Sequence, residues 1–171
     1  MEVARSAAAN GHLDVLHYLH TNGCPWDERV TRGAAQNGHL NALQYLHESG
    51  CPWDHEATRR AAGSGHVDVL RYLCDSDCPR DDVVVRDAIW NGHLDVLQFL
   101  HKDGCPWDSK ATQCAASRGW LHVLKYLHEK GCPWSSFATR AAAAGGHLDV
   151  LKYLRENGCP WDRCTSISAR E

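Results

Sequence analysis

Hydrophobic and polar residues follow a pattern that repeats every 27 residues along the chain, and residues 28–54 are a typical copy. In the first half of this copy, small and apolar residues recur at the i, i+4 spacing of one helix face, which predicts a helix over residues 28–36. In the second half, a stripe of larger apolar residues predicts a helix over about residues 39–49. The residues that we expect to face the core are Val30, Thr31, Ala34, Ala35, Leu40, Ala42, Leu43, Tyr45 and Leu46.

Glycine, aspartate and proline mark the ends of the expected helices at fixed intervals. Gly38 and Gly50 end the two helices of the typical copy, because glycine accepts the positive φ that terminates a helix. Asp54 stands where the next helix needs an N-cap. Each of the six prolines directly follows a cysteine: Pro25, Pro52, Pro79, Pro106, Pro133 and Pro160. Tryptophan follows most of these Cys-Pro pairs, as Trp53 does, and we interpret these rings as plugs buried between successive helix pairs.

These intervals divide the chain into a single array without a linker or second domain. The units are residues 1–27, 28–54, 55–81, 82–108, 109–135 and 136–162, and a partial seventh unit at 163–171. Helices this short are marginal in water by themselves, so neighbouring pairs must stack. We therefore expect an all-α fold, an elongated solenoid of six helix pairs plus a partial seventh, without a deep pocket.

Composition and charge restrict the class of protein. The 171 residues are 43% hydrophobic and 23% charged, as in ordinary soluble globular proteins. The net charge of −3 gives no global basic field, so we expect no nucleic-acid partner. No apolar run approaches the roughly 18 residues of a membrane-spanning helix, and the amino terminus does not resemble a signal peptide. We therefore expect an intracellular monomer, in the cytoplasm or nucleus, including those of a host cell.

Three stretches carry a family resemblance: AANGHLDVLHYLHTNG (8–23), AAGSGHVDVLRYLCDSD (61–77) and AAAGGHLDVLKYLRENG (142–158). Their paired alanines, the Gly-His that opens the second helix and the amphipathic helix ending near glycine resemble the ankyrin repeat. The GCPWD loop is similar to that of the short variety found in giant-virus, algal and oomycete arrays, which are sometimes joined to an F-box; no F-box is present in these residues.

The resemblance implies a fold and a function. The usual ankyrin repeat has 33 residues, and the length missing here corresponds to its β-hairpin finger, so the fingers should be absent or reduced to a turn. Ankyrin repeats act in protein binding, usually through the fingers and first helices. The resemblance therefore implies a non-catalytic scaffold or adaptor that binds another protein.

Positions that differ between copies indicate a binding face, because stacking does not require them. In the first helix these positions lie opposite the alanines, and many of them carry arginine. We predict that a partner protein, including one with an acidic segment, binds this face through Arg32, Arg59, Arg60, Arg86, Trp90, Arg118 and Arg140.

Two alternatives to this interpretation stay open. The first is that the arginines pair with acidic residues of their own helices at i, i+3 or i+4. Those pairs would be Glu28–Arg32, Glu56–Arg59 and Asp82–Arg86. The second concerns Trp90, which would fill, together with Ile89, the gap left where Arg80 replaces a loop tryptophan.

Twelve histidines and nine cysteines suggest an alternative function, a metal- or haem-binding protein. Six of the cysteines precede the prolines, and the histidines form two series, one after glycine (as in His39) and one at the end of the second helix (as in His47). Equivalent residues in stacked pairs lie roughly 8–10 Å apart, too far to share a zinc ion or form a disulfide. We therefore expect no cofactor or metal, reduced thiols and no catalytic residues.

Overall fold

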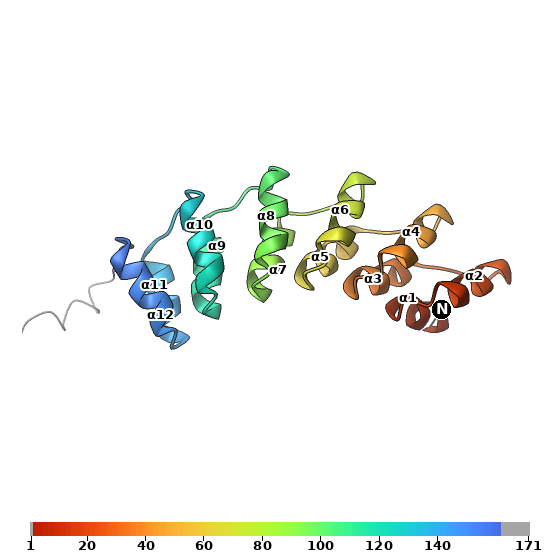
Figure 1. The fold of residues 1–171 in the computed structure, drawn as a ribbon, viewed down its shortest axis with the longest axis horizontal. Helices are drawn as coiled ribbons and strands as arrows, with labels where there is room; N and C mark the ends of the chain where they lie inside the picture. Colours follow the sequence, from red (N-terminus) through yellow and green to blue (C-terminus); the bar gives the residue numbers. More distant parts are fainter. Residues whose placement is uncertain (1, 162–171) are drawn as a thin grey trace, which may run out of the picture. The chain divides into compact units, whose positions relative to one another are not determined.

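The structure is a computed structural model that describes residues 2–161, and within that range it contains helices and no strand (Figure 1). The expectation of an all-α fold with six helix pairs is confirmed. The helices are α1 (Glu2–Ala9), α2 (Leu13–Thr21), α3 (Glu28–Gln36), α4 (Leu40–Glu48), α5 (His55–Gly63), α6 (Val67–Asp75), α7 (Val83–Asn91), α8 (Leu94–Lys102), α9 (Ser109–Arg118), α10 (Leu121–Glu129), α11 (Ser136–Ala144) and α12 (Leu148–Glu156). The expected partial seventh unit, 163–171, lies outside the described residues.

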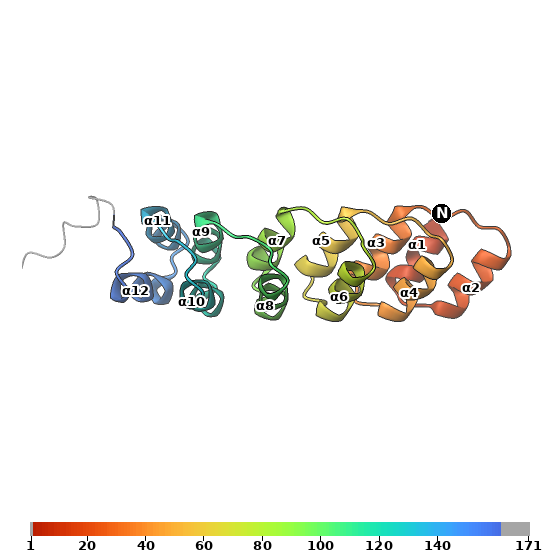
Figure 2. The same ribbon diagram turned by 90° about the horizontal axis from the view of Figure 1, so that it is seen from above.

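The chain forms two compact units, residues 1–99 and 100–171. In the first unit, α1, α3, α5 and α7 pack side by side, and α2, α4 and α6 form a second row beside them (Figure 2). In the second unit, α11 packs against α9, and α10 and α12 lie beside them in the same manner. The first helices of the repeats thus form one layer of each unit, and the second helices form another. None of the helices within residues 2–161 has the length and apolar character needed to cross a membrane.

The core of each repeat contains the residues that the periodicity predicted. In the typical copy, Val30, Thr31, Ala34 and Ala35 are all fully buried. Alanine at the position of Ala34 is buried in each of the six described repeats, because a neighbouring first helix packs directly on it. In α4, Ala42, Leu43 and Leu46 are buried, whereas Leu40 and Tyr45 are only half-buried.

Threonine and cysteine side chains close four of the repeats by hydrogen bonds to backbone carbonyls. The hydroxyl of Thr31 donates to the carbonyl of Pro52 at 3.0 Å, and the thiol of Cys51 donates to the carbonyl of Asp27 at 3.6 Å. Equivalent bonds occur at Thr58, Thr112, Thr139, Cys78, Cys132 and Cys159. The repeated Cys-Pro pair therefore has a structural role, since it supplies both a buried thiol and an accepting carbonyl.

The histidine that follows glycine joins four of the repeats to the preceding one, whereas the fifth repeat has Trp120 at this position. Nε2 of His39 lies 3.1 Å from the carbonyl oxygen of Ala9, and since a carbonyl only accepts, Nε2 carries the proton. Equivalent bonds at the same distance are made by His66, His93 and His147. The ring covers the glycine of the preceding repeat so closely that a Cβ on Gly38, at φ +74°, would approach Nδ1 of His66 to 2.6 Å. Glycine is required there both for its backbone conformation and for the ring above it.

Loop tryptophans do not act as buried plugs, contrary to the sequence-based expectation. Trp53 is half-buried and stacks on the ring of His47, with centroids 3.9 Å apart. Nδ1 of His47 is 2.8 Å from the hydroxyl of Tyr72 in the next repeat, and the Tyr72 ring lies edge-on to Trp53. Similar groups are formed by Trp26, His20 and Tyr45, by Trp107, His101 and Tyr126, and by Trp134, His128 and Tyr153. Because one face of each indole lies on an imidazole, the ring covers the edge of the interface instead of filling its interior.

Candidate protein-binding face

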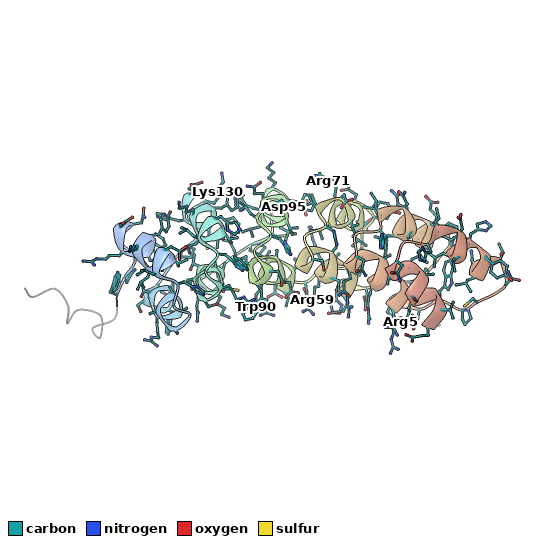
Figure 3. The ribbon with its side chains drawn as sticks, turned by 60° about the horizontal axis from the view of Figure 1, so that its bottom comes forward. Arg5, Arg59, Arg71, Trp90, Asp95 and Lys130 are labelled. Atoms are coloured by element: carbon teal, nitrogen blue, oxygen red, sulfur yellow. The ribbon has the colours of Figure 1, made fainter. Side chains whose placement is uncertain are left out.

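The outer positions of the first helices form one edge of the first unit. Figure 3 shows Arg5, Arg59 and Trp90, from α1, α5 and α7, along this edge, with Arg71 and Asp95 of the second helices on the opposite edge. The alanines of the first helices point into the stack, so a helix of 3.6 residues per turn presents its variable positions outward. These side chains thus lie opposite the buried alanines, as helix geometry predicted; their role in binding stays a prediction.

Arg32, on α3, makes an ion pair with Asp54, the residue that precedes α5, and the sequence did not reveal this pair. Its Nε donates to Oδ1 of Asp54 at 3.0 Å, and its Nη2 donates to Oδ2 of the same carboxylate, while Glu28 of its own helix lies 3.6 Å away. The hydrogen bond with Asp54 raises the pKa of Arg32 and lowers the pKa of Asp54. Asp54 therefore serves this pair and makes no side-chain N-cap bond, whereas Asp27 and Asp108 cap their helices as predicted.

Arg59 is held in a similar way by two carboxylates. Its Nε donates to Asp87 of the next repeat at 2.8 Å, and its Nη1 donates to Glu56 of its own helix at 2.5 Å. The hydrogen bond to Asp87 raises the pKa of Arg59. The alternative of intrahelical pairing is thus correct for Glu28–Arg32 and Glu56–Arg59, but each arginine also pairs with a carboxylate outside its own helix, Asp54 for Arg32 and Asp87 for Arg59. Arg86 is exposed, and no pair with Asp82 joins it to its own helix in the described part of the chain.

A shallow groove of about 460 Å³, here called the basic groove, crosses α1, α3 and α5. It is lined by Glu2, Arg5, Ser6, Ala9, Asn10, Arg29, Arg32, Gly33, Gln36, Asn37 and Arg60. Four arginines and one glutamate make its lining positive, although the chain as a whole is slightly acidic. Sequence reasoning noticed Arg5 and Arg29 on the arginine-rich face but did not include them among the binding residues.

A second groove of about 340 Å³, here called the neutral groove, lies over α5 and α7. It shares Gln36 and Arg60 with the basic groove, and its remaining lining is Glu56, Arg59, Gly63, Ser64, Asp87 and Asn91. Its two arginines face two carboxylates, and Arg59 is already bound to both of them. The two grooves therefore differ in charge although they lie on the same face.

Each groove contains a helical glycine that packing does not require. A Cβ on Gly33, in the middle of α3, would meet Ala9 and the carbonyl of Arg5 at 3.5 Å, which is ordinary van der Waals contact. A Cβ on Gly63 would likewise come no closer than 3.5 Å to Asn91. Glycine inside a helix costs about 1 kcal/mol relative to alanine. Since neither backbone conformation nor crowding requires glycine at position 33, its effect is to deepen the basic groove.

The predicted binding residues do not all come together. Arg32, Arg59 and Arg60 line the two grooves, whereas Arg86 and Trp90 lie further along the first unit on α7 and line neither. Trp90 is 50% exposed, so it does not fill the core, and Ile89 alone is fully buried there. Arg118 and Arg140 are exposed on α9 and α11 of the second unit, where the guanidinium of Arg140 lies 5.1 Å from the ring centroid of Phe137.

The histidine and cysteine series do not converge on a metal site. Within residues 2–161, no group of three or more His, Cys, Asp or Glu side chains could hold an ion. Most of these side chains have other partners: four histidines that follow glycine bond to carbonyls, three at the ends of second helices bond to tyrosine hydroxyls, and four buried cysteines donate to carbonyls. Burial raises the pKa of Cys51, Cys78 and Cys132 to about 12, which opposes formation of the thiolate that metals bind.

Comparisons with known proteins agree with this architecture. The family model described as "Ankyrin repeats (3 copies)" matches residues 5–87, 32–111 and 85–163. The crystal structure of the human ASB11 ankyrin repeat domain is similar with a TM-score of 0.81 and 20% sequence identity, over 94% of this chain and 85% of that chain. No curated protein shows significant sequence similarity to the chain.

Proposed function

The chain belongs to the ankyrin repeat family, whose repeats generally serve in protein–protein interaction, and from this membership we propose that it is a non-catalytic scaffold that binds a partner through its first-helix face. The observation that carries the proposal is the contrast between the two sides of each first helix. The inner side carries mostly small buried residues, with buried alanine at the position of Ala34 in every described copy, whereas the outer side carries exposed arginines and Trp90. The outer positions are not needed for stacking and are available for recognition.

The proposed partner surface includes exposed side chains outside the two grooves. Trp90 offers a large, half-exposed ring of the kind that is enriched at binding hot spots, and Arg86 adds a charge on the same helix. Arg118 and Arg140 occupy the corresponding face of the second unit. None of the eight described cysteines forms a disulfide, which fits a reducing, intracellular compartment, and we propose that the protein acts there as a monomer.

Site-specific photocrosslinking tests which face binds. A photoreactive benzoylphenylalanine would replace Ser64, which lines the neutral groove, or Asn41, which is exposed on second helix α4 as a matched control. We expect a discrete cross-linked protein from position 64 and none from position 41, because only the first-helix face contacts the partner. Identical products from both positions, or products from position 41 alone, would show that the proposed face is wrong.

A further inference from the structure

We infer that the partner contributes an extended, carboxylate-rich peptide segment to the basic groove over α1, α3 and α5. This inference rests on the proposed function and deepens it, since it selects one part of the first-helix face and one chemistry of the bound segment. It does not involve Trp90 or the second unit.

Two of the guanidinium groups that line the basic groove, those of Arg5 and Arg29, are only weakly engaged. Arg5 lies 3.5 Å from Glu2, whose side chain is 89% exposed, and Arg29 lies 4.0 Å from Asp27 with 59% of its own side chain exposed. Solvent-exposed pairs at such distances contribute little free energy. A carboxylate of a bound peptide therefore competes for these two arginines without having to break a strong contact.

Arg60, on α5 at the other side of the groove, is held in position before a ligand arrives. Its Nη1 donates to Oε1 of Gln36 at 2.6 Å, and its Nε lies 3.5 Å from Glu56. These contacts orient the planar guanidinium, which has five N–H donors and matches a carboxylate in geometry. Within the described residues its Nη2 group is not used by either contact, so it is available to a ligand.

The shape of the groove favours an extended chain. The groove is shallow and crosses three helices that lie side by side, and Gly33 and Ala9 line it between the arginines. Gly33 weakens α3 but keeps side-chain volume out of the groove, where a Cβ would be sterically tolerated. A peptide backbone can thus lie between Arg5 and Arg29 on one side and Arg60 on the other.

The neutral groove explains why the inference is limited to α1, α3 and α5. There, Glu56 and Asp87 already occupy the guanidinium of Arg59, so this chain supplies its own acidic ligands. An acidic segment that continued over α7 would meet these two carboxylates and be repelled. The charge of the two grooves therefore favours an acidic ligand over α1, α3 and α5 and opposes its continuation over α7.

Fluorescence anisotropy with the full chain tests the inference. The probes are a short fluorescein-labelled peptide of alternating glutamate and glycine and its counterpart with glutamine in place of every glutamate. We expect the glutamate peptide to bind about tenfold more tightly at low salt and to lose this advantage as salt rises. The double variant Arg5→Gln/Arg29→Gln should lower the affinity about tenfold, whereas the control Lys102→Gln/Lys152→Gln, which removes the same charge from two exposed positions on second helices, should leave it unchanged.

Gly33→Leu separates loss of the groove from loss of the fold. Leucine favours the helix and fills the basic groove, so this variant should melt at the same or a higher temperature and yet bind the glutamate peptide at least about tenfold more weakly. Equal affinity for the two peptides, an equal effect of the control double variant, or full binding by a stable Gly33→Leu variant would each overturn the inference. These results do not bear on the cross-linking from position 64. The proposal of an acidic ligand can therefore be wrong while the proposal that the first-helix face binds the partner remains supported.

Discussion

Buried thiols repeat along the chain, one near the end of most helix pairs, and each keeps its proton. Burial raises the pKa of Cys51 and Cys132 to about 12 and that of Cys159 to about 11, while each thiol donates to a carbonyl at the start of its own repeat. Because the thiolate is the reactive form, these groups should be inert in the folded protein.

The first prediction concerns this protection. At pH 8 a thiol reagent such as Ellman's reagent should modify the buried cysteines slowly in the native protein, whereas all nine cysteines should react at once in urea. The pKa values of the buried thiols in the folded protein lie above that of an unfolded thiol. Their contribution to the free energy of unfolding is therefore complete below about pH 8.5 and is lost as the pH rises from there towards the folded pKa values. Fewer than nine reactive thiols in the unfolded protein would instead reveal a disulfide.

The second prediction concerns the ion pair between Arg32 and Asp54. Arg32→Gln should lower the free energy of unfolding by about 1 kcal/mol at pH 7, because it leaves a partly buried carboxylate without its partner. The pKa of Asp54 is lowered in the folded state, so the pair stabilises above the unfolded pKa of about 4 and this contribution disappears as the pH falls further. Urea unfolding at pH 7 and pH 3 measures both effects. If the wild-type protein and Arg32→Gln differed in free energy of unfolding as much at pH 3 as at pH 7, the role given to the pair of Arg32 and Asp54 would be wrong. Arg86→Gln is the control and should have no effect at either pH.

At the scale of helices and loops, one interface differs from its neighbours in a coordinated way. Where other repeats have His, Trp and Tyr, the junction of the third and fourth repeats has Cys74, Arg80 and Phe99. Arg80 donates to the sulfur of Cys74 at 3.6 Å, and the guanidinium of Arg71 lies 4.9 Å from the centre of the Phe99 ring. The three aromatic or imidazole rings of this interface are therefore replaced by contacts of arginines with sulfur and with a phenyl ring.

The third prediction compares these two kinds of interface. Trp53→Ala should lower the free energy of unfolding by about 2 kcal/mol, less than for a fully buried tryptophan, because the ring is half-buried and stacked on His47. Arg80→Ala, at the equivalent position of the next repeat, should cost less than about 0.5 kcal/mol. Urea unfolding of both variants measures the difference, and equal losses would show that the stacked group adds nothing beyond the loop backbone.

Helix positions were predictable from sequence, and contacts between repeats were only partly so. The bounds of α3 were predicted to the residue and those of α4 to one residue, because the hydrophobic period and the glycines act within a single repeat. The pairing of Arg32 with Asp54 could not be read in this way, since Asp54 also satisfied the rule for an N-cap and only the packing shows which role it takes. The replacement of His, Trp and Tyr by Cys74, Arg80 and Phe99 was present in the aligned repeats and could have indicated that these three positions touch.

At the scale of the whole molecule, the proposed binding site is made of residues from several repeats. The basic groove takes its lining from three repeats of the first unit, none of which forms it alone. The sequence predicted the face, because variable positions share one side of each first helix, but not the groove. The depth of a groove depends on how Gly33 and Ala9 meet across two helices, and the sequence pattern does not contain that information.

The bonds between repeats have a consequence for how the gene can change. Each His-to-carbonyl bond spans 30 residues and each His-to-Tyr bond spans 25, so every contact reaches one repeat and no further. Duplication or unequal exchange of one 27-residue block of coding sequence therefore returns every surviving side chain to an equivalent partner. The number of repeats can therefore change by whole repeats without a change in the kind of contacts between neighbours.

Deleting residues 28–54 tests this property as the fourth prediction. The joined chain should place His66 over Gly11, with its Nε2 bonded to the carbonyl of Ala9, and Tyr72 beside His20. Far-UV circular dichroism and urea unfolding should show a helical protein that unfolds cooperatively, since the first unit still has three helix pairs. Deletion of residues 28–40 removes less of the chain but takes away α3, against which both α1 and α5 pack, and leaves α4 without its partner helix. This shorter deletion should therefore lower the free energy of unfolding more than the deletion of residues 28–54. Whether a deletion is tolerated therefore depends on whether it removes a whole 27-residue repeat, and not on how many residues it removes.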